Sequence, residues 1–329
     1  MTKVAIVGAT GRVGQYAALS ISRIPHVHEV LLYGRAGSES TLEGIARDLI
    51  DSSAATGTNT KVSYSAEITD LKGSDIIVFT AGIARKPDQT RNDLAYENAR
   101  IVAEFASKIK DIAPDSFILM ITNPVDIMTE VALKYSGKLP NEVFGLGTHL
   151  DSMRLKSEIA SFFHVHVSEV HTRIIGEHGE SMVPLWSATT LGGIQITNLP
   201  GFVNVPKDEM MQFVRMQGQK IIASKGATIW GPGDAISTIV RTILGNENRI
   251  LTVSAYIKSE VHNIGGVCIG VPALLNRTGV YPVSIRIEPD EVKQFRESVE
   301  KIREISNKIF TELQSEEFGV PHDKSQDQL

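Results

Sequence analysis

The chain has 329 residues, 42% of them hydrophobic and 22% charged, and a formal net charge of −5. These values are typical of a globular protein with enough apolar side chains for two domain cores. No block of basic residues occurs, which excludes nucleic acid and anionic membranes as expected partners. The N-terminus is too short for a signal-peptide core, and no run of about 18 apolar residues occurs. Because Cys268 is the only cysteine, an intrachain disulfide and a Cys-based zinc site are excluded. We expect a soluble cytoplasmic protein.

Short apolar runs alternate with helical patterns through the first half of the chain. The sequence predicts strands at residues 3–7, 29–33, 61–64, 75–80, 116–121 and 143–146, and helices at 15–23, 42–53 and 94–112. Almost wholly apolar strands separated by helices are typical of a parallel sheet with helices on both faces. We therefore expect an α/β fold whose N-terminal domain, residues 1–147, is a Rossmann-type doubly wound parallel sheet.

Glycines follow the first predicted strand in the pattern Gly8-x-x-Gly11-x-x-Gly14. A glycine turn lets the backbone approach a pyrophosphate, and the next helix offers its N-terminal N–H groups to the phosphate charge. The spacing is one residue longer than G-x-G-x-x-G, and glycines also mark ordinary strand–helix turns. The strand before and the helix after this turn favour dinucleotide binding.

The end of the second strand normally decides which dinucleotide binds. An acidic residue there would bind the ribose hydroxyls of NAD, whereas an Arg favours the 2′-phosphate of NADP. This strand runs instead into Gly34 and Arg35, with Ser38 close behind. The guanidinium and the hydroxyl suit a phosphate, so we expect NADP, with NAD as the alternative. A solvated turn with an incidental Arg is the other interpretation.

Polar side chains follow two further strands, at the sheet edge where ligands of open α/β folds bind. Arg85 and Arg91 stand six residues apart in the loop after 75–80 and together suit a dicarboxylate. Asn123 follows the strand at 116–121 and can donate to a substrate oxygen. Taken alone, such a loop is more often solvated, and Asn is common before a proline such as Pro124.

The second half carries three candidate catalytic residues. Asp151 and Arg154 are three residues apart at the start of a predicted helix and therefore share one face, although this spacing also suits a surface ion pair. His178 stands between glycines after an apolar run, in a turn that presents its ring to a cleft. An imidazole there can transfer a proton at neutral pH, although a lone His is more often structural.

The rest of the second half mixes strands and helices. We expect strands at 165–175, 193–196, 250–257, 267–271 and 281–287, a helix at 208–224 and a long terminal helix marked by apolar residues from Val292 to Ile309. The run Gly231-Pro232-Gly233 is expected to break a helical pattern. These elements predict an α+β substrate domain over 148–315, followed by a polar, frayed tail at 316–329.

Five motifs occur in a fixed order along the chain. After the glycine turn come Arg85-Lys86-Pro87 with Thr90-Arg91-x-Asp93-Leu94, then Thr122-Asn123-Pro124-Val125-Asp126, Leu150-Asp151-x-x-Arg154 and Gly176-Glu177-His178-Gly179. Together they resemble the lactate/malate dehydrogenase superfamily, most closely the lactate-dehydrogenase-like malate dehydrogenases of archaea, over roughly residues 2–315.

The resemblance implies a role for each matching residue. His178 would be the acid–base catalyst, oriented by Asp151, and Arg91 would polarise the substrate carbonyl. Arg154 would bind the C1 carboxylate, Asn123 the substrate oxygen, and Thr228 would line the pocket. The expected cofactor-binding residues are Gly8, Thr10, Gly11, Arg12, Val13, Gly14, Gly34, Arg35, Ser38, Thr80, Ala81, Gly82, Asn98, Thr122 and Asn123.

Arg85 decides the expected substrate. In this superfamily its position is cationic in malate enzymes and usually Gln in lactate enzymes. An Arg pairs with the second carboxylate of oxaloacetate, whereas pyruvate would leave it desolvated and unpaired. The resemblance thus implies a malate dehydrogenase that converts malate and oxaloacetate reversibly, as in the tricarboxylic acid cycle, and that assembles as a homodimer or homotetramer. No metal ion is expected.

Two departures from the family pattern concern the loop and the cofactor. Asp88 follows Pro87 where relatives often have glycine, which adds negative charge beside an anion site. Gly34 replaces the usual ribose-binding Asp, as in archaeal relatives that accept NADP.

Four other functions remain open at this point. A lactate-type dehydrogenase for another 2-hydroxy acid differs from the malate enzyme only in its substrate pocket. The glycine turn also resembles that of extended short-chain dehydrogenases, but no tyrosine here has Lys four residues later. Dinucleotide-dependent glycosidases use a Cys-containing metal site, whereas Cys268 stands in an apolar run. A dinucleotide-sensing protein without catalysis would need a broken catalytic set.

Overall fold

The computed structural model describes the backbone of residues 1–83 and 91–317, and the side chains of residues 1–83 and 94–315. Its centre is a sheet of nine strands in the order β14-β13-β12-β6-β5-β4-β1-β2-β3. Strands β1 to β6 are parallel and span Lys3–Val7, Glu29–Tyr33, Lys61–Ser65, Ile76–Phe79, Phe117–Met120 and Val143–Gly145. All the strands predicted for the first half are confirmed, in the strand order of a doubly wound Rossmann sheet.

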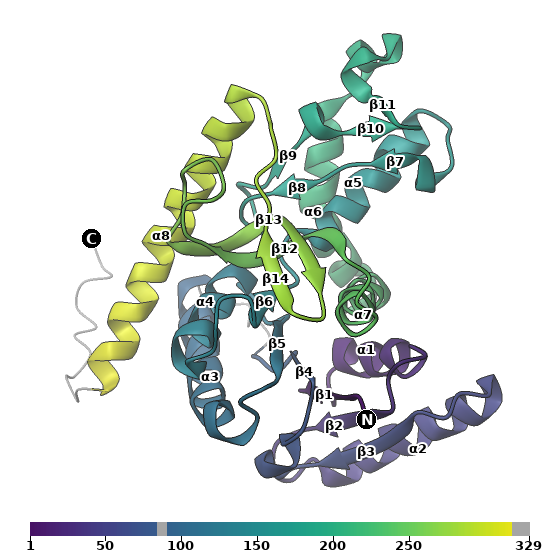
Figure 1. The fold of residues 1–329 in the computed structure, drawn as a ribbon, viewed down its shortest axis with the longest axis vertical. Helices are drawn as coiled ribbons and strands as arrows, with labels where there is room; N and C mark the ends of the chain where they lie inside the picture. The colour runs from purple at the N-terminus through teal and green to yellow at the C-terminus, as the bar shows by residue number, and fades with distance from the viewer. Residues whose placement is uncertain (84–90, 318–329) are drawn as a thin grey trace.

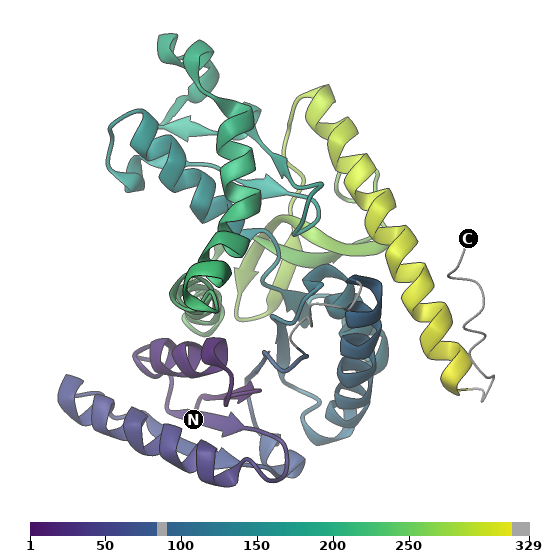
Figure 2. The same cartoon turned by 180° about the vertical axis from the view of Figure 1, so that it is seen from behind.

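Helices cover both faces of this sheet. The first four are α1 to α4, at Arg12–Ser22, Glu39–Thr56, Arg91–Ile112 and Val125–Ser136. In Figure 1, α1 and α2 lie on one side of the sheet, and α3 and α4 on the other. Two later helices complete the layers: α7, Trp230–Leu244, packs beside α1, and α8, Pro289–Glu317, runs along α3 and α4. Figure 2 shows the same pairings from behind.

Alternation along each strand divides the core in two. In β1, the side chains of Val4 and Ile6 pack in the cluster that contains α1, α2 and α7. Those of Ala5 and Val7 pack in the cluster that contains α3, α4 and the end of α8. Successive side chains of a strand point to opposite faces, so a wholly apolar strand requires helices on both sides. The burial of β4, which has no exposed position, follows the same rule.

The second half extends the sheet instead of standing apart from it. Strands β12, β13 and β14, at Arg249–Ile257, Val267–Asn276 and Gly279–Pro282, add antiparallel to the edge at β6. Two further helices, α5 at His149–Phe162 and α6 at Lys207–Lys225, enclose a third apolar cluster. Two small sheets join them, formed by β7, β10 and β11 at Val170–His171, Thr190–Leu191 and Ile194–Gln195, and by β8 and β9 at Ile174–Ile175 and Val183–Pro184. Short 3-10 helices span Ile68–Leu71, Val167–Glu169, Trp186–Ala188, Ile196–Asn198 and Pro200–Asn204.

Three local predictions for the second half are wrong. The expected strand at 165–175 is a 3-10 turn followed by β7 and β8, and the strand expected at 281–287 ends at Pro282. Gly231-Pro232-Gly233 does not break a helix but lies in the first turn of α7. Proline is tolerated there because the N–H that it lacks has no partner within the helix at that point.

The predicted fold class is confirmed as a whole: an N-terminal Rossmann sheet followed by a C-terminal α+β region. In the described part of the chain, no helix has the length and apolar character needed to cross a membrane. The residues of the predicted tail beyond Glu317 lie outside the described residues, as do Arg85 and Asp88.

Candidate active site

Asp151 and Arg154 project from the first turns of α5, as their spacing predicts. The Asp151 side chain is only 1% exposed, and its Oδ1 accepts a hydrogen bond from Nη1 of Arg154 at 3.0 Å. The Arg154 side chain is 14% exposed, so the pair is sheltered from the screening that weakens surface ion pairs. A guanidinium held in this way keeps further N–H donors for an anionic ligand.

His178 lies in the turn between β8 and β9. Its ring nitrogen Nδ1 is 2.5 Å from Oδ2 of Asp151, although the two residues are 27 positions apart. The His178 side chain is 28% exposed, whereas the Asp151 carboxylate is buried. Because Nδ1 is occupied by Asp151, Nε2 is the nitrogen left to act on a ligand. The predicted carboxylate–histidine pair is present.

The charge of Asp151 governs the protonation of this histidine. It raises the pKa of His178 to about 9 against the opposing effect of burial. The hydrogen bond to the same carboxylate and the charge of Asp126 act in the same direction, and Arg154 acts against them. The protonated imidazole is therefore the stable form at neutral pH, ready to act as a proton donor.

The turn that carries His178 is tied to three other elements. Gly176 exchanges main-chain hydrogen bonds with Gly270 of β13. The N–H of Glu177 donates to Ser298 of α8 at 2.8 Å, and Lys301 of the same helix donates to the Glu177 carboxylate at 2.7 Å. The N–H of His178 itself donates to Oδ2 of Asp126. The turn is thus held at each successive residue.

The glycine turn after β1 has the features that a pyrophosphate needs. Gly8 has φ +83°, and a Cβ there would lie 2.7 Å from the main-chain nitrogen of Ala81. A Cβ on Gly14 would lie 2.7 Å from the Gly8 carbonyl. Gly11 precedes α1 and makes no side-chain cap, so the N–H groups of the first turn remain free for an anion. The turn fits the phosphates of a dinucleotide.

Further predicted cofactor residues gather around this turn. Thr80 donates from Oγ1 to the carbonyl of Val7 at 2.8 Å, at the end of β4. Thr10 precedes α1, and Arg12 and Val13 are its first two residues. The Arg12 side chain extends to the C-terminal half of the chain. Its Nη1 donates to the carbonyl of Lys225 at 3.1 Å. The phosphate turn is thereby linked to the segment that leads into Thr228.

Asn98 joins the ends of two strands at the same edge. Its Nδ2 donates to the Asn123 carbonyl at 2.9 Å, and its Oδ1 accepts from the N–H of Ile83 at 2.8 Å. Thr122 donates to the carbonyl of Ala81 at 2.6 Å, and a Cβ on Gly82 would lie 2.6 Å from the Thr122 methyl. The predicted polar residues after β4 and β5 are therefore brought together, and the Asn123 side chain stands exposed.

The remaining predicted residues are placed less completely. Arg85 lies outside the described residues, and of Arg91 the structure describes only that it begins α3. Thr228 lies half-buried between α6 and α7. The structure adds Asp126 to the residues around His178, although the sequence pattern assigns it no role. An acidic residue in the first turn of the helix after a predicted site loop is the signal that marks it.

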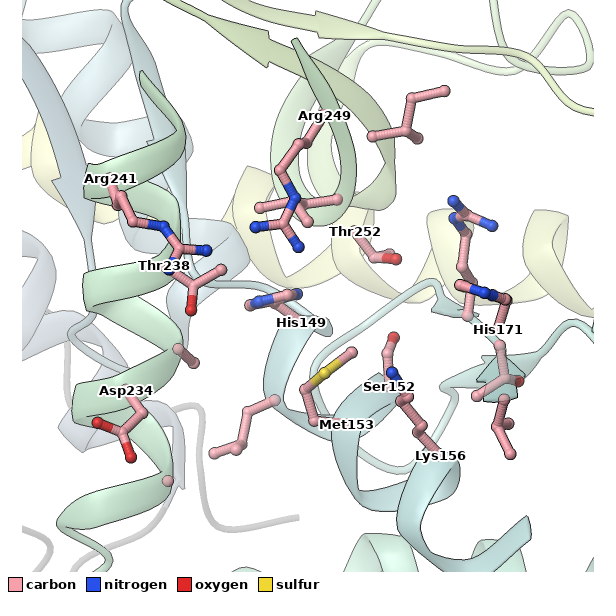
Figure 3. Close-up of a pocket in the computed structure, with 18 residues that line it drawn as sticks. His149, Ser152, Met153, Lys156, His171, Asp234, Thr238, Arg241, Arg249 and Thr252 are labelled. Atoms are coloured by element: carbon pink, nitrogen blue, oxygen red, sulfur yellow. The ribbon is translucent and has the colours of Figure 1, made fainter. Parts of the chain in front are cut away.

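A separate hollow of about 520 Å³ lies on the other side of α5 (Figure 3). Its walls include His149, Ser152 and Lys156 of α5, together with Arg241 and Arg249. With 3.6 residues per turn, these α5 positions face away from Asp151 and Arg154. Burial and the nearby charge of Arg249 lower the pKa of His149 to about 4, so this histidine stays neutral. This pocket is separate from the cluster formed by Asp151, Arg154 and His178.

Comparisons with known proteins agree with the geometry. Residues 2–145 match the model of the lactate/malate dehydrogenase NAD binding domain, and residues 148–313 that of the lactate/malate dehydrogenase alpha/beta C-terminal domain.

Three individual relatives illustrate the match. A malate dehydrogenase of Methanothermobacter marburgensis is 46% identical over 95% of this chain and 99% of its own. An L-2-hydroxycarboxylate dehydrogenase (NAD(P)(+)) of Methanocaldococcus jannaschii is 45% identical over 93% and 99%. The solved structure of an Archaeoglobus fulgidus malate dehydrogenase in complex with NADH covers 94% of this chain and 100% of its own, with 36% identity and a TM-score of 0.84. The chain therefore belongs to the lactate/malate dehydrogenase family and is an oxidoreductase that binds a nicotinamide dinucleotide.

Proposed function

We propose that this enzyme is a malate dehydrogenase, which interconverts malate and oxaloacetate with His178 as the acid–base catalyst. The observation that carries the proposal is the sealed Asp151 carboxylate, which contacts both His178 and Arg154. One carboxylate thus orients a proton donor and an anion-binding guanidinium toward the same ligand.

The residues divide the chemistry between them. The bound nicotinamide supplies or accepts the hydride. In the reducing direction the protonated His178 donates a proton from Nε2 to the ketone oxygen, and in the oxidising direction the neutral ring accepts the hydroxyl proton. Arg154 binds the C1 carboxylate through paired N–H donors. Asn123 donates to the substrate oxygen, and Thr228 lines the pocket.

Arg91 and Arg85 complete the proposed site. Arg85 belongs to the segment that connects β4 with α3, and Arg91 is the first residue of α3, the helix whose Asn98 donates to the Asn123 carbonyl. Arg91 would stabilise negative charge on the reacting oxygen, and Arg85 would bind the second carboxylate of oxaloacetate. The proposal for these residues rests on their position in the family motif.

A turnover assay tests the proposed function. Oxidation of NADPH and of NADH is measured with oxaloacetate and with pyruvate, at equal substrate concentrations. Turnover with oxaloacetate well above that with pyruvate is the expected result. A broad L-2-hydroxy acid dehydrogenase is the second candidate, favoured by the name of the Methanocaldococcus jannaschii relative, and comparable rates with the two acids would support it. The absence of turnover with either acid would contradict both and favour a dinucleotide sensor.

We further propose that NADP is preferred over NAD, because the tip of β2 carries Arg35 and Ser38 in place of an acidic residue. Arg35 is exposed, and Ser38 precedes the first turn of α2. The Ser38 hydroxyl donates to the Arg35 carbonyl at 2.6 Å and so keeps the turn compact. A guanidinium and a helix N-terminus are both favourable for a phosphate dianion.

Introducing an acidic residue at position 34 is expected to shift the preference toward NAD, through repulsion of the 2′-phosphate. A Cβ on Gly34 would lie 2.5 Å from the Ser38 hydroxyl and 3.1 Å from Leu42, so the substitution needs room. The matched pair is therefore Gly34→Asp with Ser38→Ala against Ser38→Ala alone. We expect the NADP/NAD ratio of kcat/KM to fall by about tenfold or more. This decrease corresponds to a loss of about 1.4 kcal/mol in the binding of the 2′-phosphate. An equal ratio in the two variants would contradict the assignment.

We also propose that the enzyme assembles as a homodimer or homotetramer. This proposal rests on the family resemblance.

A further inference from the structure

Arg12 lies where the proposed phosphate turn meets the C-terminal half of the chain. It is the first residue of α1, directly after Gly11. Its side chain is exposed, and its Nη1 donates to the main-chain carbonyl of Lys225, 213 residues further along the chain, at 3.1 Å. Lys225 is the last residue of α6. One guanidinium therefore connects the start of the first Rossmann helix with the end of a helix in the second half.

The end of α6 is suited to this contact. Gly226 caps the helix with φ +84°, and a Cβ there would lie 3.1 Å from Nη1 of Arg12, so a larger residue would crowd the guanidinium. The last carbonyls of a helix have no partner within it and carry partial negative charge, which favours a cation. The Lys225 ammonium lies instead over the ring of Trp230, 3.6 Å from its centroid. Arg12 therefore supplies the positive charge at the Lys225 carbonyl.

The two helices on either side of Thr228 are held differently. α7 packs closely on α1, where a Cβ on Gly233 would lie 2.2 Å from the ring of Tyr16. The last turn of α6, by contrast, has exposed residues at every position from 222 to 226. A segment with few buried contacts opens at a low cost in free energy. A single contact such as that of Arg12 can therefore decide how well the end of α6 is fixed.

We propose that Arg12 is a positioning residue that couples the cofactor to the substrate pocket. It binds the dinucleotide phosphates and the Lys225 carbonyl at the same time, and so fixes the end of α6 and the segment that carries Thr228. The inference deepens the proposed function, on which the role of Thr228 rests, by naming the residue that connects an occupied phosphate turn with the pocket.

The guanidinium has enough donors for both contacts. It carries five N–H groups in a planar fork, and the Lys225 carbonyl accepts from Nη1. Phosphate oxygens accept strong charge-assisted hydrogen bonds from such a fork. The phosphates and the carbonyl end of α6 are both negative, so they repel each other, whereas a cation between them attracts both. Binding of the phosphates also restricts the long Arg12 side chain, which lowers the entropic cost of its contact with Lys225.

The test compares Arg12→Gln with Arg23→Gln. Gln keeps an N–H donor but removes the charge and the fork. Arg23 is an exposed arginine at the other end of α1, where it donates to Ser52, so its replacement removes the same charge away from the glycine turn. Because both side chains are exposed, both variants are expected to fold.

Amide hydrogen exchange of the full-length protein is measured without cofactor and with NADPH or NADH at a concentration that saturates each variant. In wild type and Arg23→Gln we expect the cofactor to slow exchange in residues 222–229 by about tenfold, which corresponds to about 1.4 kcal/mol. In Arg12→Gln the slowing should be less than about twofold. Slower exchange in residues 8–14 reports in every variant that the cofactor is bound.

Binding measurements test the connection to the substrate pocket. The probe is tartronate, a dicarboxylic 2-hydroxy acid one carbon shorter than malate. Coupling between two ligands is reciprocal, so the factor by which tartronate lowers the Kd of the reduced dinucleotide measures the coupling in both directions. We expect this factor to fall by about five- to tenfold in Arg12→Gln and to stay unchanged in Arg23→Gln.

Equal slowing of residues 222–229 in Arg12→Gln and wild type would overturn the proposal, as would an unchanged coupling factor. Faster exchange of this segment in wild type on cofactor binding would also overturn it, because the phosphates would then take the guanidinium away from Lys225. The exchange experiment uses no substrate, so its result stands even if tartronate does not bind. A lack of tartronate binding would instead count against the proposed function.

Discussion

Replacing Asp151 by Asn is expected to lower kcat for oxaloacetate reduction by about 1,000- to 10,000-fold. A Ser-His-Asp triad loses a similar factor in kcat when its Asp is replaced by Asn. The reason is twofold. The pKa of His178 loses its largest supporting charge, so the proton donor is depleted at pH 7, and Arg154 loses the partner that holds it beside the ring. Steady-state kinetics from pH 5 to 10 in both directions measures the effect.

A matched control for this variant is Glu158→Gln. Glu158 lies on the same helix, seven residues or about 10 Å further along its axis. We expect it to retain kcat within about twofold, since this half-buried side chain lies two helical turns away from Asp151. A kcat for Asp151→Asn within tenfold of wild type would show that His178 does not depend on this carboxylate and would remove the basis of the proposed mechanism.

The same pair also predicts the pH dependence of stability. The folded state holds the pKa of His178 at about 9, above its ordinary value of 6.5. A raised histidine pKa gives stability that is fully present below 6.5 and is lost as pH rises through 9. In wild type, this contribution to the free energy of unfolding should therefore decline between pH 6.5 and 9. In Asp151→Asn the decline should be much smaller, which thermal unfolding at each pH would detect.

Replacing Arg85 by Gln is expected to convert a strong preference for oxaloacetate into a weak one. Loss of one charge-assisted pair with the second carboxylate, about 1.5–3 kcal/mol, corresponds to a decrease of about 10- to 150-fold in kcat/KM for oxaloacetate. For pyruvate, kcat/KM should rise, because the desolvated and unpaired cation is removed. Both values are measured with the same cofactor at saturation.

Lys86→Gln provides the control for the Arg85 variant, since it removes one positive charge from the adjacent position of the same loop. Its ratio of oxaloacetate to pyruvate kcat/KM should stay close to wild type. If the two variants shift this ratio equally, the general charge of the loop selects the substrate and not a specific pair at Arg85. If neither shifts it, Arg85 does not select the substrate.

Local patterns were sufficient for much of the fold. The apolar runs of β1, β2 and β4 predicted strands within one residue of their observed ends because a strand buried on both faces admits few polar residues. The same reasoning failed at Gly231-Pro232-Gly233, where two helix-disfavouring residue types suggested a break. Their cost depends on the position within the helix, and the first turn tolerates them.

The sequence by itself predicted candidate site residues and which of them would share a face. Asp151 and Arg154 lie on one face of α5 because a helix of 3.6 residues per turn places positions i and i+3 together. The glycines after β1 likewise predict a phosphate turn, since the absence of a Cβ is known from residue type and glycine readily adopts a positive φ such as that of Gly8.

Only the tertiary structure decided which partners meet across the chain. The contact of Asp126 with the His178 main chain and the addition of β12 to the edge of β6 join segments far apart in sequence, and neither was expected from the sequence. Periodicity specifies the face of an element but not the surface that packs against it. The second carboxylate behind His178 became visible only when α4 and the turn between β8 and β9 were packed together.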